Sequence, residues 1–157
     1  MAQSTPATQF LLKAGVAFEL ATYAYDPDAA KIGLQAAEAL GEPAHRVLKT
    51  LVAEVDGKPV CIVLPSDREA SLKKVAAVAG GKSARMAAPA DAERITGYKI
   101  GGVSPFGQKK RLPVLVEQAA LTEPYVFVNG GQRGLQIRLA PADLVTAAGA
   151  TAAAIVG

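Results

Sequence analysis

The chain is organised around residues 96–111, which read TGYKIGGVSPFGQKKR. The short run 98–100 predicts an apolar strand that leads into the glycine pair Gly101 and Gly102. Glycine lets the backbone turn sharply or approach a ligand closely, and Pro105 would hold the exit rigid. A loop of uncrowded backbone N–H groups followed by a basic run can hold a polar or anionic group. An ordinary turn beside a solvated charge run explains the same residues equally well.

Length and composition bound what the protein can be. With 157 residues, 50% of them hydrophobic, the chain can bury the core of a single domain spanning residues 1–157. A net charge of +3 permits a nucleic-acid partner but lacks the dense basic stripe of a DNA-binding protein, so no DNA partner is expected. The N-terminus lacks the pattern of a signal peptide, and no apolar run reaches the roughly 18 residues of a membrane span. We therefore expect a cytoplasmic protein with no membrane partner.

Short helical and strand-like segments alternate along the chain without a regular βαβ period or an internal repeat. This mixture predicts an α+β fold in which one curled, mixed, barrel-like β-sheet is flanked by helices. Helix starts are indicated by Thr5 before Pro6, by Pro43, and by Ser66 with Glu69 as a capping box. The predicted helices cover residues 6–14, 34–40, 43–51, 72–79, 89–95 and 141–148. The other predicted strands cover residues 18–25, 50–55, 60–64, 83–87, 113–116, 125–129, 135–139 and 152–156, with hairpin turns at 56–57 and 130–134.

Lys49 is the most informative single residue. It lies in the apolar segment 47–52, VLKTLV, at the junction between a predicted helix and a predicted strand. Burying an ammonium group is costly unless a partner compensates for the lost hydration. Either the Lys49 stem lies along the apolar surface with its head in water, or the head points into a cavity. The second alternative would make Lys49 a catalytic or binding residue.

No side chain has the sequence setting of a catalytic nucleophile. Cys61 lies within a continuous apolar strand, where a thiol packs as a small hydrophobic group. Ser104 lacks a Gly-x-Ser-x-Gly setting, and the single histidine, His45, has no visible reason to be its base. One cysteine and one histidine cannot form a disulfide or an ordinary Cys/His zinc site, so no metal or cofactor is expected. A lysine and backbone donors would still suffice to cleave an activated acyl ester.

Motifs along nearly the whole chain resemble those of the YbaK/ProX family of aminoacyl-tRNA deacylases, and within it the YbaK branch. The matching segments occur in order at Thr5-Pro6-Ala7, Thr22-Tyr23, Asp26-Pro27, residues 47–51 (VLKTL), residues 72–75 (LKKV), residues 96–113 and residues 130–135 (GGQRGL). The resemblance implies a curled mixed sheet flanked by helices. The same domain type occurs as an editing insertion in bacterial prolyl-tRNA synthetases.

The resemblance implies a trans-editing enzyme that removes cysteine mischarged onto proline tRNA, Cys-tRNA(Pro). A synthetase pocket sized for proline rejects a smaller amino acid only weakly, so a second site must clear the error. In the YbaK branch the thiol of the substrate is thought to attack its own ester carbonyl and release a cyclic thiolactone. That chemistry would account for the missing nucleophile. The implied partners are the acceptor end of a mischarged aminoacyl-tRNA and prolyl-tRNA synthetase.

Site residues follow from the resemblance position by position. Lys49 matches the essential lysine of the family, which would hold the aminoacyl ester or the terminal ribose and phosphate. Gly101 and Gly102 match the loop whose backbone faces the carbonyl, and Tyr23 matches an aromatic wall of the pocket. Three further positions in or beside the matching segments are expected to contact the substrate: Ser104, Pro105 and Gly130.

Three expected substrate-binding positions depart from the YbaK pattern. Ile32 stands where a phenylalanine is familiar, Asn129 where a serine is, and Gln136 where an aspartate is. These changes alter the polarity and size expected of the pocket. They leave open whether the enzyme prefers cysteine, alanine or another small mischarged residue.

The basic run Lys109, Lys110 and Arg111 offers contacts for the tRNA acceptor stem, and a solvated rim is an equally good explanation. A non-catalytic module that binds tRNA or a synthetase is a further alternative to deacylation. It would form a complex without cleaving the ester, and its binding would not depend on Lys49.

Overall fold

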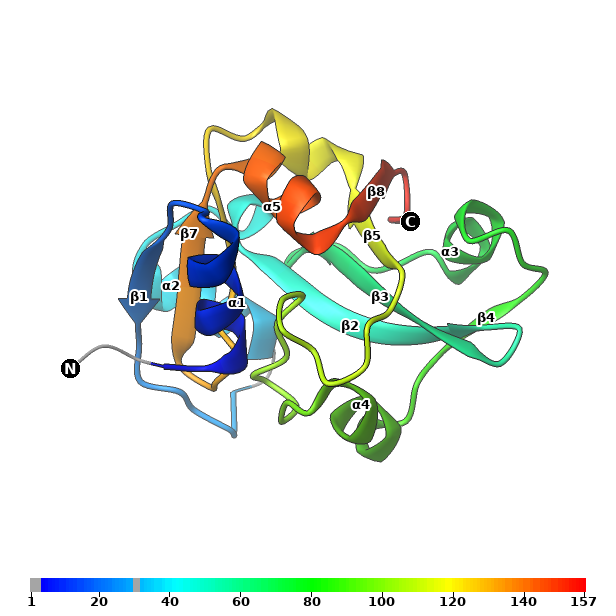
Figure 1. Cartoon of the computed structure of the whole chain (residues 1–157), viewed down its shortest axis with the longest axis horizontal. Helices are drawn as coiled ribbons and strands as arrows, with labels where there is room; N and C mark the ends of the chain where they lie inside the picture. The colour runs from blue at the N-terminus through cyan, green and yellow to red at the C-terminus, as the bar shows by residue number, and fades with distance from the viewer. Residues whose placement is uncertain (1–3, 30–31) are drawn as a thin grey trace.

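Two β-sheets form the framework of the protein in the computed structural model, which describes residues 4–29 and 32–157 (Figure 1). The strands are β1 (Glu19–Thr22), β2 (Leu48–Val55), β3 (Lys58–Pro65), β4 (Ala84–Met86), β5 (Val114–Glu117), β6 (Val126–Asn129), β7 (Leu135–Leu139) and β8 (Ala150–Ala153). The α-helices of the described residues are α1 (Pro6–Ala14), α2 (Ile32–Leu40), α3 (Leu72–Val78), α4 (Pro89–Thr96) and α5 (Pro141–Ala148). Two short 3-10 helices are η1 (Ala44–Arg46) and η2 (Gln118–Thr122). None of the helices in the described ranges is long and apolar enough to cross a bilayer.

The α+β class is confirmed, but the prediction of one barrel-like sheet is wrong. A five-stranded sheet has the order β4-β2-β3-β5-β8, and a three-stranded sheet has the order β1-β7-β6. The two sheets meet at an isolated parallel bridge between Val47 and Phe127. The edge of β2 that faces away from β3 pairs with β4 only from Ala53 to Val55. The sheets therefore diverge along the first half of β2 and do not close into a barrel.

The hairpin of β2 and β3 is the longest paired element, and its predicted turn is confirmed. Asp56 and Gly57 have φ angles of 50° and 83°, the left-handed pair that matches the twist of a two-residue hairpin. All eight residues of β2 pair with β3, from Leu48 opposite Pro65 to Val55 opposite Lys58. On its other edge β3 pairs in parallel with β5. The apolar run 60–64 is thus a central strand, as its composition predicts.

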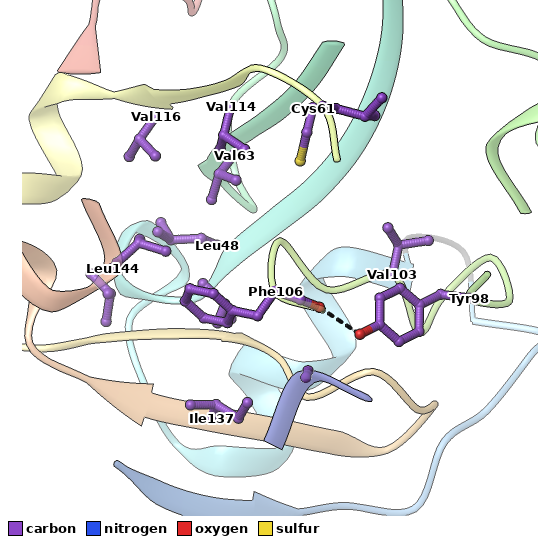
Figure 2. Close-up of a cluster of buried hydrophobic side chains, with 14 of the residues drawn as sticks. Leu48, Cys61, Val63, Tyr98, Val103, Phe106, Val114, Val116, Ile137 and Leu144 are labelled. Atoms are coloured by element: carbon purple, nitrogen blue, oxygen red, sulfur yellow. Dashed lines mark hydrogen bonds between the residues drawn. The ribbon is translucent and has the colours of Figure 1, made fainter. Parts of the chain in front are cut away.

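The main core lies where the two sheets and the loop 97–113 come together (Figure 2). Phe106, on this loop, is 1% exposed and packs with side chains from both sheets, including Val63, Val116 and Ile137. The Tyr98 hydroxyl donates a hydrogen bond to the Phe106 carbonyl, which ties the start of the loop to its middle. The core thus fixes the course of the segment that carries the glycine pair.

The strand predicted at residues 98–100 is wrong, because this segment is a turn. Gly97 ends α4 in the left-handed region at a φ of 82°. Gly102 then donates its N–H to the Lys99 carbonyl at 2.8 Å, which closes the turn. The left-handed Gly97, the turn bond of Gly102 and the buried Tyr98 side chain hold this conformation, and residues 98–100 belong to neither sheet.

Two predicted helix starts are also wrong. The helix predicted from Pro43 to Leu51 is only the 3-10 helix η1, and β2 begins at Leu48 because the segment pairs with β3 over its whole length. The residue that caps α3 is Ser71, whose Oγ accepts the N–H of Lys74 at 3.3 Å. Ser66 instead donates its hydroxyl to the Val47 carbonyl. The Ser66 side chain therefore stabilises the backbone just before β2 and is not the N-cap of α3.

The remaining elements follow the sequence closely. Thr5 caps α1, and Gly15 ends the helix at a φ of 71°, as predicted. The predicted strand 18–25 is shorter than expected, because only Glu19 to Thr22 pair with β7. The last predicted strand starts earlier, at Ala150, and pairs in parallel with β5.

Candidate active site

A cavity of about 310 Å³ lies along the first half of β2, where the two sheets diverge. At one end it is bounded by residues on or next to the three-stranded sheet, and at the other by Met86 and the start of α4. The polar side chains that line it are Tyr23, Lys49, Thr50, Asn129 and Gln136. The rest of the wall is mainly apolar and includes Leu48, Leu51, Val52, Ile100 and Val103. This is the volume and mixed character of a site for a small ligand group.

Lys49 lies in the wall of this cavity, on β2. Its side chain is 19% exposed, and its Nζ lies 3.7 Å from Oε1 of Glu69, whose own side chain is 89% exposed. An ion pair with so exposed a carboxylate is weak and readily exchanged. Lys49 thus lines the cavity while its ammonium lies beside a carboxylate that is exposed to solvent, and its role as a catalytic or binding residue stays a prediction.

Gly101 lines the same cavity. Its φ is 88°, and a Cβ at this position would lie 2.5 Å from the Tyr25 hydroxyl oxygen, so only glycine fits. Within the described residues, no hydrogen bond is donated by the Gly101 N–H. The N–H of Gly102 is by contrast used in the turn to Lys99. Of the two amides, the Gly101 amide is therefore the one available to a ligand.

The polar wall of the cavity combines an aromatic residue with two amides. Burial raises the pKa of the Tyr23 phenol above its usual value, and hydrogen bonding with the Gln136 side chain opposes that rise. Asn129 donates from Nδ2 to the Gly101 carbonyl at 3.0 Å, and its Oδ1 accepts the N–H groups of Gly131 and Gln132. The side-chain amide of Asn129 is therefore engaged in hydrogen bonds to the backbone of the glycine-pair loop and of the loop between β6 and β7.

Two buried acceptors in the cavity wall lack partners. Gln136 is 4% exposed and Thr50 is 9% exposed. Among the described residues, neither Oε1 of Gln136 nor Oγ1 of Thr50 has a hydrogen-bond partner. Unsatisfied buried polar atoms are costly, and a ligand that donates hydrogen bonds would satisfy them. Sequence reasoning missed Thr50, because nothing local in the sequence shows that its hydroxyl lacks a hydrogen-bond partner among the described residues.

Several predicted substrate contacts do not line this cavity. They are Gly102, Ser104, Pro105 and Gly130. Ser104 is fully buried, and its Oγ accepts the N–H of Phe106 at 3.3 Å. Pro105 borders a second cavity of about 220 Å³ on the side of α5. The side chain of Ile32, at the start of α2, lies outside the described residues.

The basic run Lys109, Lys110 and Arg111 is exposed and lies outside the main cavity. The N–H groups of the two lysines bond to the carbonyls of Thr96 and Ile95, which fixes the run beside the end of α4. The three side chains are therefore presented from an ordered backbone.

The single cysteine and the single histidine lie outside the cavity lining. Cys61 is fully buried on β3, and burial raises the pKa of its thiol to about 12, so it stays protonated. His45 lies on η1 and contacts Glu123 at 3.4 Å. Within residues 4–29 and 32–157, no group of three or more His, Cys, Asp or Glu side chains could hold a metal ion. The arrangement can hold and polarise an acyl ester, and among the described residues no cysteine, serine or histidine lines the cavity.

The family of the chain follows from sequence comparison. The model of the aminoacyl-tRNA editing domain matches residues 26–147. The chain belongs to this family. The resemblance found from the motifs is thereby confirmed, and the cavity described above is the cavity of an editing domain.

Individual relatives of this editing domain are found both as separate proteins and inside larger enzymes. The chain is 41% identical over 112 residues to EbsC of Enterococcus faecalis, to which deacylation of Cys-tRNA(Pro) and Cys-tRNA(Cys) is ascribed, and the match covers 70% of the chain and 68% of EbsC. It is also 33% identical over 85 residues to the proline–tRNA ligase of Acidithiobacillus ferrooxidans. This match covers 54% of the chain but only 15% of the ligase. The editing domain thus corresponds to a small part of the ligase.

A solved structure extends the likeness over the whole editing domain. The crystal structure described as that of a trans-editing enzyme for prolyl-tRNA synthetase superposes with a TM-score of 0.85 and 25% identity, and the match covers 99% of both chains. The structure of the hypothetical protein APE2540 superposes with a TM-score of 0.86 at 23% identity, which supports the fold alone.

Proposed function

We propose that the protein is an aminoacyl-tRNA deacylase that clears cysteine from Cys-tRNA(Pro) in trans. The observation that carries this proposal is that one cavity of an editing domain is lined by both Lys49 and Gly101, whose N–H donates no hydrogen bond within the described residues. Among the described residues no cysteine, serine or histidine lines the cavity, which fits a substrate that carries its own nucleophile. The activity ascribed to EbsC supports cysteine as the amino acid.

In the proposed mechanism the protein positions the ester and stabilises charge. The Gly101 N–H donates to the ester carbonyl oxygen, and this bond strengthens as the oxygen becomes an oxyanion. Lys49 supplies positive charge to the ester or to the neighbouring ribose and phosphate. The cysteine sulfur forms a bond to the carbonyl carbon, the bond from that carbon to the ribose oxygen breaks, and the thiol proton ends on the ribose hydroxyl. The products are the free tRNA and a cyclic thiolactone.

The neutral wall of the cavity suits the α-ammonium group of the aminoacyl ester. Gln136 Oε1 and Thr50 Oγ1 are buried acceptors without partners, and an ammonium group donates three hydrogen bonds. No carboxylate lines the cavity among the described residues, so this recognition relies on neutral oxygens. Hydrogen bonds to these atoms would hold the carbonyl near Gly101.

The direct test measures deacylation of Cys-tRNA(Pro), Ala-tRNA(Pro) and Pro-tRNA(Pro) by the wild-type protein and by Lys49→Ala. We expect loss of the cysteinyl ester, survival of the prolyl ester, and a decrease of about 10²-fold or more in kcat/KM for Lys49→Ala. Lys73→Ala is the matched control, because Lys73 is exposed on α3 and does not line the cavity.

Three results of this test would separate the alternatives. Faster loss of the alanyl ester would assign a different amino acid to the same deacylase. Tight tRNA binding without cleavage, unchanged in Lys49→Ala, would point to a non-catalytic module. Detection of the thiolactone by mass spectrometry would support attack by the substrate thiol, and release of free cysteine alone would contradict it.

A partner would select the tRNA. The match to the proline–tRNA ligase covers 15% of that enzyme, and the solved structure that matches 99% of the chain is described as a trans-editing enzyme for prolyl-tRNA synthetase, which supports that synthetase as the partner. We place the protein in the cytoplasm beside prolyl-tRNA synthetase, which would hold the mischarged tRNA. Co-purification of the two proteins with tRNA(Pro) present, and not without it, is the expected outcome.

A further inference from the structure

We propose that Arg133 is a positioning residue that aims the Gly101 N–H into the cavity. This inference rests on the function proposed above and adds a residue to its machinery. Arg133 lies in the loop between β6 and β7, is exposed, and does not line the cavity. Its effect on the substrate is therefore indirect and passes through the Ile100–Gly101 peptide.

The first contact is a hydrogen bond to the backbone. Arg133 donates from Nε to the Ile100 carbonyl at 2.8 Å. In a trans peptide the C=O and the following N–H point in opposite directions. Holding the Ile100 carbonyl on the Arg133 side therefore turns the Gly101 N–H to the opposite side, and Gly101 itself lines the cavity.

The guanidinium is itself held in place. It lies over the ring of Tyr25, 5.2 Å from the ring centroid, as a cation–π pair. A Cβ on Gly101 would lie 2.5 Å from the hydroxyl oxygen of the same tyrosine. Tyr25 thus contacts both Arg133 and the Ile100–Gly101 peptide, and the cation–π pair adds a second interaction that favours the arginine at the carbonyl.

The next peptide is fixed from both sides. Asn129 donates to the Gly101 carbonyl at 3.0 Å, and the Gly102 N–H donates to the Lys99 carbonyl at 2.8 Å. A Cβ on Gly102 would lie 2.9 Å from the backbone nitrogen of Arg133, so the two loops are in direct contact. Because the Gly101–Gly102 peptide is held by these bonds, the orientation of the preceding Ile100–Gly101 peptide depends on the hydrogen bond from Arg133 to the Ile100 carbonyl.

Removing the guanidinium should release that rotation and misdirect the donor. Misplacement of an oxyanion donor slows chemistry by about 10²-fold, because the bond is made mainly in the transition state. We expect Arg133→Gln to lower kcat by about 10- to 100-fold, with KM within about twofold of the wild-type value. Arg133→Lys should retain part of the activity, since it can still donate to the carbonyl but has no planar Nε.

The competing role for an exposed arginine is direct binding of a tRNA phosphate. That role would raise KM, leave kcat unchanged and weaken the salt dependence of KM. The test is steady-state deacylation of Cys-tRNA(Pro) at several salt concentrations. Arg94→Gln is the control, because Arg94 is an arginine with a 69% exposed side chain on α4 outside the cavity lining. Restoration of kcat in Arg133→Ala by added guanidinium ions would support positioning, and a pure KM effect would overturn it.

A second measurement keeps the inference testable apart from the deacylase activity. If the wild-type protein cleaves none of the aminoacyl-tRNAs, the proposed function fails, and the loop geometry is then tested by NMR of the amide groups. In the free protein, Arg133→Gln should shift the amide resonance of Gly101, which belongs to the released peptide, much more than that of Gly102, which keeps its hydrogen bond to Lys99, while the urea midpoint stays unchanged. An unchanged Gly101 resonance would overturn the positioning role.

Discussion

At the scale of single residues, Gly101 carries the most stringent geometric requirement of the site. Its φ of 88° strains any other residue, and a Cβ would meet the Tyr25 hydroxyl at 2.5 Å. Gly80 is a matched control, because its φ is 78° and nothing lies within 4 Å of a Cβ there. The two glycines thus separate the cost of the backbone conformation from the cost of the contact.

We expect Gly80→Ala to lower the free energy of unfolding by about 1–2 kcal/mol and to leave deacylation unchanged. Gly101→Ala should cost more, and it should lower kcat by about 10²-fold as the donor is displaced. Adding Tyr25→Phe to Gly101→Ala should recover part of the stability, because the hydroxyl oxygen is the nearest atom. Urea unfolding and deacylation rates check this, and equal costs for the two glycines would contradict it.

The role of a single residue can be predicted from the sequence when the residues that it contacts in the fold are also close to it in the chain. Cys61 could be recognised as a core residue because its apolar neighbours on the strand are adjacent in sequence. Thr50 and Arg133 could not be recognised as site residues. Their importance comes from a missing hydrogen-bond partner and from a contact with Ile100, 33 positions earlier in the chain. Such long-range contacts leave no local pattern.

At the scale of elements, turns and caps that depend on local chemistry were predictable, and strand pairing was not. The Asp56-Gly57 turn and the Thr5-Pro6 helix start occur as predicted. The segment that carries Lys49 reads locally as the end of a helix, yet pairing with β3 makes it a strand. The separation into two sheets likewise depends on β1 pairing with β7, more than a hundred residues apart by sequence number.

The start of α3 gives a test at this scale, because the sequence pointed to Ser66 and the structure to Ser71. Replacing the N-cap by Ser71→Ala should lower the free energy of unfolding by about 1 kcal/mol. Ser71→Asp should stay within a few tenths of a kcal/mol of wild type, since aspartate is an equally good cap. The cavity lining contains no residue of α3, so deacylation should be unchanged in both variants. Urea unfolding that shows no loss for Ser71→Ala would contradict the cap.

At the scale of the whole molecule, the question is where a tRNA would approach a protein whose net charge is only +3. Total charge sets a weak, long-range attraction, whereas contacts to phosphates depend on where the cations lie. The run Lys109, Lys110 and Arg111 is exposed on an ordered backbone at the end of α4, and the first residues of that helix border the cavity. An acceptor stem lying along this run would bring its end toward Lys49.

Two triple variants with the same total charge separate location from net charge. The first variant has glutamine in place of Lys109, Lys110 and Arg111. The second has glutamine in place of three other exposed residues, Lys13, Lys58 and Lys82. Each variant loses three positive charges, which takes the net charge from +3 to 0. We expect the first variant to raise KM for Cys-tRNA(Pro) with little change in kcat. Its slope of log KM against log salt should fall by about 0.7–0.9 for each tRNA phosphate that the run no longer neutralises. The second variant should change KM much less. Equal effects of the two variants would mean that overall charge alone attracts the tRNA, and no effect of either would remove the run from the binding surface.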